Sequence, residues 1–250
     1  NGLGVTEEDT DVKSEKSLRI VGRITVTSPV ARTTYFAAQP ATITWTTKNV
    51  TQNLQIMYST TYSDDGNPDN DFPAASFQVI SGCENIPYTE VSKEFTMPTD
   101  VTQHVKFRVV QNDKPTEVFG DSADCIIKGS LALVAASSQN QSLTVGTKHT
   151  FSWVPTGTFT KLKAYYIIDG VKKPINEDLN GALTSVDWTP GDTDISANIL
   201  FRIEDYYDGT NIYSETPSDK KNTCVGTFSI TSPTTVLNNE LTVGSTGEYI

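Results

Sequence analysis

Apolar residues occupy every second position in several short stretches of the chain. Val105, Phe107 and Val109 share one face of such a stretch, and residues 199–203 (Ile, Leu, Phe, Arg, Ile) repeat the spacing. This alternation predicts half-buried β-strands. No stretch shows the period of an amphipathic helix. The pattern therefore predicts an all-β protein.

Further strands follow from the same pattern. In "KLKAYYIIDG", Lys161 and Lys163 lie on the face opposite to the apolar residues, which is typical of a sheet with one solvated face. "NLQIMYST", residues 53–60, alternates in the same way. The segments "KEFTMP" and "VDWTP" each predict one more strand, which we expect to end before Pro98 and Pro190.

The chain contains an internal repeat. Stretches beginning at Gly22, Gly129 and Gly226 each open with a short alternating run and pass through a turn rich in Ser, Thr and Asn, and they lie about 100 residues apart. The first two continue into a second alternating run that carries Trp45 or Trp153. About seven short strands per repeat, separated by frequent turn signals, predict an immunoglobulin-like (Ig-like) β-sandwich.

The repeat divides the chain into four parts. We expect residues 23–129 and 130–226 to form Ig-like domains, residues 1–22 to be the closing hairpin of a preceding repeat, and residues 227–250 to be the first strands of a following one. The alternative is that the two end segments complete each other in one split domain. The joints contain almost no linker, which predicts tandem sandwiches in a semi-rigid rod.

Composition narrows the classes of partner. The 250 residues carry a net charge of −11, and no cluster of Lys and Arg offers a surface for nucleic acid. No apolar run is long enough to span a membrane. About one residue in seven is threonine, which suits both strands and O-glycosylation. Of the three cysteines, Cys125 and Cys224 occupy matching places that suggest packing, whereas a Cys83–Cys125 disulfide is the alternative.

The first repeat contains an acidic insertion, "SDDGNPDNDFP", that we consider as a metal site. Carboxylate and amide side chains recur there at every second position, as calcium ligands do in a flexible loop: Asp65, Asn67, Asp69 and Asp71. The alternative is a plain solvated loop, since Asp, Asn, Gly and Pro all form turns. Calcium is the one cofactor that the sequence suggests.

Other candidate residues concern glycans and catalysis. Tyr206 and Tyr207, in "EDYYDGTNIY", are placed on a hairpin that could stack sugars or pack against a neighbouring domain. Asn49 and Asn140 begin N-glycosylation sequons. The two histidines of the chain lie beside strands without a nucleophile motif, so we expect them to face solvent. We therefore expect no enzyme activity.

The sequence resembles that of a known class of protein. The Ig-like repeats of Ser/Thr-rich fungal cell-wall proteins and of many bacterial surface proteins share a set of short elements, which the first repeat contains: Ser28–Pro29, Ile43–Trp45, Ile56–Thr60, Pro98, Phe107–Val109 and Ser122–Asp124. The second repeat retains Ser152–Trp153, Phe201–Ile203 and Ser218–Asp219. The resemblance implies extracellular scaffolding without catalytic residues.

Together these observations predict an extracellular structural segment of a cell-surface repeat protein. Such a segment spaces or tiles the cell envelope, as in a surface layer, and its partners are neighbouring repeats or further copies of the same protein. One alternative is an adhesin segment that binds glycans or a partner protein. Another is an accessory region of a secreted enzyme.

Overall fold

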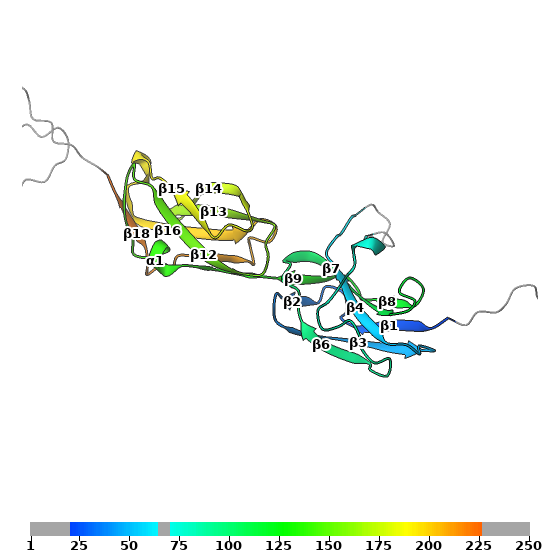
Figure 1. The fold of residues 1–250 in the computed structure, drawn as a ribbon. Coiled ribbons are helices and arrows are strands. Elements are labelled where there is room, and N and C mark those ends of the chain that lie inside the picture. The colour runs from blue at the N-terminus through cyan, green and yellow to red at the C-terminus, as the bar shows by residue number, and fades with distance from the viewer. Residues whose placement is uncertain (1–20, 65–70, 227–250) are drawn as a thin grey trace, which may run out of the picture.

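The computed structural model describes residues 21–64 and 71–226, and these form two β-sandwiches placed end to end (Figure 1). The closing hairpin expected in residues 1–22 lies outside the described residues except for its last two positions, and the strands expected in 227–250 lie wholly outside them. In the described part, no helix has the length and apolar character needed to cross a membrane.

The first sandwich contains nine strands in two sheets. In chain order they are β1 (Arg23–Ser28), β2 (Thr34–Phe36), β3 (Pro40–Lys48), β4 (Leu54–Ser59), β5 (Gln78–Val79), β6 (Ser92–Thr96), β7 (Thr102–Gln111), β8 (Phe119–Asp121) and β9 (Cys125–Lys128), with a 3₁₀ turn at Ala74–Ser76. One sheet has the order β1-β3-β6. The other has the order β2-β9-β7-β4-β5, and β8 also pairs with β7.

The second sandwich repeats this plan. Its elements are β10 (Ser130–Leu133), α1 (Ala135–Ser138), β11 (Ser142–Thr144), β12 (His149–Thr156), β13 (Lys161–Ile168), β14 (Val171–Asn180), β15 (Ser185–Trp188), a 3₁₀ turn at Asp192–Asp194, β16 (Ser196–Asp205), β17 (Tyr213–Glu215) and β18 (Asn222–Val225). The sheets have the orders β10-β12-β15 and β11-β18-β16-β13-β14, and β17 also pairs with β16.

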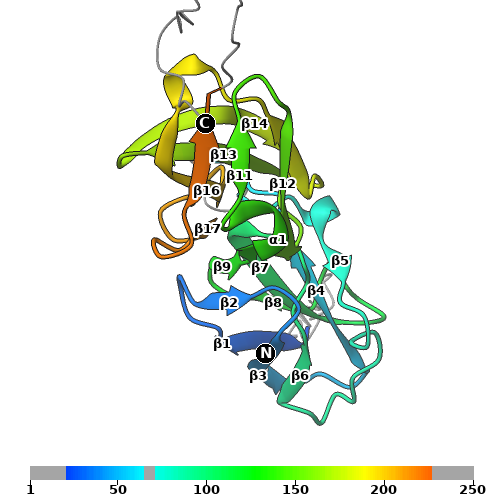
Figure 2. The same ribbon diagram turned by 90° about the vertical axis from the view of Figure 1, so that its left-hand side faces the viewer.

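The strand order identifies both sandwiches as Ig-like. In each, the chain begins in the three-stranded sheet and then crosses to the other sheet, where a short strand runs parallel to the last one: β2 with β9, and β11 with β18. Figure 2 shows β11 beside the orange strand β18. The expected fold class, tandem Ig-like β-sandwiches, is confirmed.

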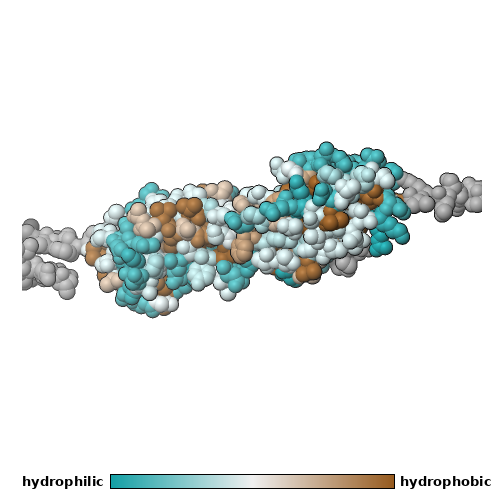
Figure 3. All heavy atoms as spheres, turned by 90° about the horizontal axis from the view of Figure 1, so that it is seen from below, coloured by the Kyte–Doolittle hydropathy of each residue, from teal (hydrophilic) through white to brown (hydrophobic). Residues whose placement is uncertain are grey.

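Each sandwich has its own apolar core between its sheets. Trp45 and Phe107 are buried in the first core, and Trp153 and Phe201 are buried in the second. Phe201 stacks on Phe151 with 4.5 Å between ring centroids. The alternation read from the sequence therefore selects the inward faces of β3, β7, β12 and β16. On the face seen in Figure 3, the surface is mostly hydrophilic to intermediate, with scattered apolar patches.

An arginine binds the last hairpin at the equivalent position in both sandwiches, the β7–β8 hairpin in the first and the β16–β17 hairpin in the second. Arg108 on β7 pairs with Asp121 on β8, with Nε 2.6 Å from Oδ1, and its guanidinium lies 4.2 Å from the Phe119 ring centroid. Arg202 on β16 repeats this arrangement with Glu215 and the Tyr213 ring on β17. The sequence pattern identified Phe107 and Phe201 but not the paired role of the arginines that follow them.

Several local features differ from the expectations. The ten-residue strand β14 and the short helix α1 were not predicted. β14 escapes the pattern because its polar residues face solvent along most of an edge strand, and Pro174 interrupts it. The three cysteines are free and buried, so the packing role expected for Cys125 and Cys224 is confirmed and a Cys83–Cys125 disulfide is not formed.

Candidate functional site

The joint between the two sandwiches is closely packed. Gly129 is the single residue between β9 and β10. A Cβ atom at this position would lie 2.6 Å from the Thr156 carbonyl oxygen and 2.6 Å from Cγ2 of Val101. Gly157, with φ +103°, also approaches Val101, and a Cβ there would lie 2.7 Å from the same methyl group. The joint therefore needs glycine at both positions.

Backbone hydrogen bonds connect the two sandwiches directly. The amide of Val101, in the turn between β6 and β7, donates to the Thr158 carbonyl at 3.0 Å, and the Thr158 amide donates to the Thr99 carbonyl at 2.6 Å. The Val101 side chain packs against the core of the second sandwich although it belongs to the first. These contacts resemble those within a domain more than those of a free linker, which favours a fixed orientation.

A hairpin of the second sandwich reaches back over the joint. The loop between β16 and β17 carries Tyr206, Tyr207 and Asp208, and the Asp208 carboxylate lies 3.3 Å from Nζ of Lys128 at the end of β9. The Asp205 carboxylate accepts the Asp208 amide at 2.8 Å and so closes the loop. Burial raises the pKa of the Asp205 carboxyl above its usual value. The loop is thus held by Asp205 at its start and by the ion pair between Asp208 and the first sandwich.

A cleft of about 550 Å³ opens between this loop and the first sandwich. Tyr62, Gln103 and His104 form one side, and Thr160, Asp205 and Tyr207 form the other. Clefts at domain interfaces are common places for small ligands. We therefore take this cleft as the candidate functional site.

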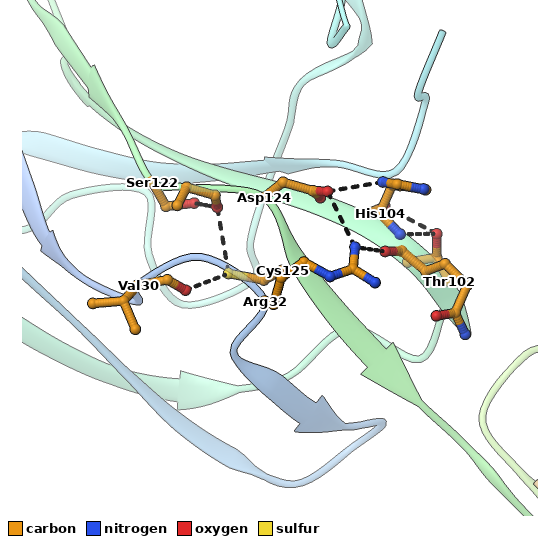
Figure 4. A network of polar contacts seen from close by, with 9 residues as sticks. Val30, Arg32, Thr102, His104, Ser122, Asp124 and Cys125 are labelled. Carbon is orange, nitrogen blue, oxygen red and sulfur yellow. Dashed lines mark hydrogen bonds and ion pairs between the residues drawn. The ribbon is translucent and has the colours of Figure 1, made fainter. Parts of the chain in front are cut away.

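A polar network holds His104 in place on one side of the cleft (Figure 4). Nδ1 of His104 lies 2.8 Å from Oδ2 of Asp124, and Arg32 reaches the same oxygen at 3.5 Å and the Gln103 carbonyl at 3.2 Å. The imidazole also stacks on the Tyr62 ring at 3.8 Å. The second ring nitrogen points away from Asp124 and has no hydrogen-bond partner among the described residues.

The nearby Ser122 and Cys125 do not complete a nucleophile site with His104. The Ser122 hydroxyl accepts the Phe107 amide and donates to the Ala123 carbonyl. Thr216 accepts the Phe201 amide at the equivalent place of the second sandwich, which identifies a structural role. The Cys125 thiol is fully buried, and burial raises its pKa to about 11. A protonated, inaccessible thiol is a poor nucleophile.

A second recess, of about 460 Å³, adjoins the cleft on the outer face of the second sandwich. Arg202 and Lys172 both pair with Glu204 there, at 2.7 and 3.2 Å. The Lys163 ammonium lies 4.3 Å from the Tyr206 ring centroid and has no carboxylate partner in the described part of the chain. Asp205 and Tyr207 line both this recess and the cleft.

The two tyrosines predicted as glycan ligands lie where the two recesses meet. Tyr207 is 64% exposed and Tyr206 is 37% exposed, and their rings form an edge-to-face pair with centroids 5.0 Å apart. The rings are accessible to a sugar, and the loop that carries them contacts the first sandwich. Both alternatives considered from the sequence, sugar stacking and packing against a neighbouring domain, therefore stay open. Sugar binding itself stays a prediction.

The predicted calcium site is only partly described. Asp65, Asn67 and Asp69 lie outside the described residues. The carbonyl of Asp71 accepts the Ser63 amide at 2.9 Å, which closes the base of the loop. No group of three or more His, Cys, Asp or Glu side chains suited to a metal occurs within residues 21–64 and 71–226. The calcium site stays a prediction.

The histidines, predicted to face solvent, do so only in part. His104 is half-buried in the network described above, and Nε2 of His149 lies 2.8 Å from the Ser137 carbonyl, with its ring stacked near Phe201. Sequence alternation missed both partners, because they come from distant segments. Asn49 and Asn140, the sequon asparagines, are exposed in turns with positive φ.

Comparisons with known proteins return similar architectures. No protein-family model matches the sequence, and no curated protein matches it either. Solved structures that align with it include fibronectin(III)-like modules of Clostridium thermocellum CbhA (16% identity, 81% of this chain and 94% of that chain, TM-score 0.26). Dpr11 IG1 bound to DIP-gamma IG+IG2 (9%, 81% and 98%, 0.35) and the tandem Ig repeats of Dlar (8%, 83% and 100%, 0.26) also align. At these scores the Ig-like assignment depends on this chain's own strand order.

Proposed function

We propose that this chain is an extracellular structural segment of a cell-surface repeat protein, in which rigidly joined Ig-like domains space or tile the cell envelope as in a surface layer. The observation that carries this proposal is the joint. Its backbone hydrogen bonds and the Val101 contact connect one sandwich to the next across a single glycine. A spacer needs a fixed orientation between successive units, and flexible linkers do not supply it.

A pair of residues equivalent to Val101 and Gly129 occurs at the far end of the second sandwich. Ile195 occupies the turn between β15 and β16, as Val101 occupies the turn between β6 and β7, and it is 56% exposed. A Cβ on Gly226 would lie 2.9 Å from Cδ1 of Ile195, just as one on Gly129 would meet Val101. This equivalence supports an array in which each repeat offers an apolar residue to the next.

Small-angle scattering tests the rigid spacer. The native chain should give a distance distribution that one elongated arrangement of the two sandwiches reproduces. A variant with four Gly/Ser residues inserted after Gly129 should require an ensemble of arrangements. The proposal is wrong if the native chain needs the same broad ensemble as the variant with the inserted linker.

A second candidate function is adhesion, and the exposure of Tyr207 at the mouth of the cleft favours it. An exposed tyrosine offers an apolar ring face together with a polar hydroxyl, which suits amphipathic ligands such as sugars. Spacing and adhesion are compatible in one protein, since the binding surface would be presented at a fixed point along the rod.

A further inference from the structure

We propose that the cleft and the adjoining recess form one groove for a short oligosaccharide bearing a carboxylate, and that this groove crosses the joint between the two repeats. The inference rests on the adhesion function and not on the envelope array. Its first support is continuity, because Asp205 and Tyr207 line both hollows. An extended ligand can therefore pass from His104 over the Tyr207 ring to Lys163.

The shape and lining of the groove favour a sugar over an apolar ligand. The groove is open, and its most exposed aromatic surface is the Tyr207 ring, on which a sugar ring can stack. Apart from the aliphatic Val101 and the other tyrosine rings, most of its lining side chains are polar. The Gln103 amide and the Thr160 hydroxyl have no hydrogen-bond partners among the described residues, so they are free to bind sugar hydroxyls.

The charge of the recess favours a carboxylate-bearing sugar. Arg202 and Lys172 both pair with Glu204, whereas within residues 21–64 and 71–226 the Lys163 ammonium contacts the Tyr206 ring and has no carboxylate partner. A cation in a recess that no described carboxylate neutralises can attract an anion locally, against the repulsion of a chain with net charge −11. The carboxylate of the ligand would lie at Lys163, and the neutral sugar rings would extend across Tyr207 toward His104.

The aromatic loop is also organised before any ligand arrives. The Asp205 carboxylate holds the Asp208 amide, and Asp208 pairs with Lys128 of the first repeat. Tyr207 is thus fixed relative to His104, and little ordering cost remains for binding. Since the groove has one wall on each repeat, binding should depend on the joint as well as on individual side chains.

A glycan array with neutral, uronate-containing and sialylated oligosaccharides, followed by titration calorimetry with the strongest binder, tests the proposal. Binding should be confined to carboxylate-bearing glycans. Tyr207→Ala should weaken it about tenfold or more through the lost stacking surface. Lys163→Gln should weaken it while reducing the preference over the matching neutral glycan.

Tyr88→Ala is the matched control, because Tyr88 is 44% exposed in a loop of the first repeat and lines none of the recesses described here. It should leave the affinity unchanged. The Gly/Ser insertion after Gly129 should weaken binding by separating the two walls. Four results would each overturn the proposal: an array without binding, binding only to neutral glycans, affinity that Tyr207→Ala leaves intact, and equal affinity for a tetraglutamate peptide.

The proposed spacer function and the proposed groove can be refuted independently of each other. A native chain that scatters as one rigid body but binds no glycan overturns the groove and leaves the spacer. A chain that scatters as a broad ensemble yet binds carboxylate-bearing glycans through Tyr207 overturns the spacer and shows that the groove forms upon binding.

Discussion

The contact of Val101 with the second core gives a direct test of coupling between the repeats. Replacing Val101 by alanine removes two methyl groups from a half-buried position against that core. At about 0.8 kcal/mol for each fully buried carbon, a half-buried pair corresponds to about 1 kcal/mol of lost joint stability. The backbone hydrogen bonds of Thr158 would then open about five times more often.

Native-state hydrogen exchange measures this opening. The amides of Val101 and Thr158 donate across the joint, so both should exchange about fivefold faster in Val101→Ala, while amides deep in β7 and β16 should keep their rates. Ile195→Ala is the matched control, because it truncates the equivalent exposed side chain of the second repeat and should change nothing in this joint. Equal exchange rates in the two variants would refute the coupling.

Three further predictions concern single features of the sandwiches. Phe107→Ala empties the centre of the first core and should lower its unfolding free energy by about 3–5 kcal/mol in urea titrations, with the second sandwich little changed. Arg202→Lys loses the separate guanidinium contacts to Glu204, to Glu215 and to the Gly209 carbonyl, and it should cost about 1–2 kcal/mol, seen as a lower melting temperature. Burial raises the pKa of both Tyr35 and Tyr58 to about 12, and the pKa values of Tyr62, Tyr165 and Tyr166 are raised as well, so tyrosinate absorbance should show several late-titrating groups. Since these pKa values exceed the unfolded value near 10, the stabilisation present below pH 10 should be lost as pH rises toward 12.

The fold could be predicted because the alternation of apolar and polar residues is visible within each strand and occurs in both repeats. Alternation fixes which face of a strand is buried, and the matching positions of Trp45 and Trp153 place the same strand in both repeats. Pro98 and Pro190 lie just beyond β6 and β15, as expected from the missing amide of proline. β14 was missed because an edge strand with a mostly solvated surface carries little apolar signal.

The candidate site was only partly predictable. Exposure of Tyr206 and Tyr207 follows from a turn sequence between two strands. The rest of the cleft does not, because Tyr62 and His104 belong to the other repeat and meet Tyr207 only through the geometry of the joint. That geometry depends on the absence of a Cβ atom at Gly129 and on the positive φ of Gly157. The alternation of apolar and polar residues carries no information about either.

The comparison of the two repeats separates scaffold from specificity. Arg108 and Arg202 each pair with a carboxylate and lie over an aromatic ring of the equivalent hairpin, so their guanidinium groups stabilise the fold. The surface beside them is not shared, because the recess of the first repeat is lined by side chains such as Phe77 and Phe119, whereas that of the second presents Lys163. In the part of the chain that the structure describes, Lys163 lies beside exposed tyrosines without a carboxylate partner, so no ion pair of the fold accounts for its position. We therefore expect the residues that determine ligand specificity to lie on the second repeat and at its joint with the first. The β16–β17 hairpin, held by Arg202, positions them.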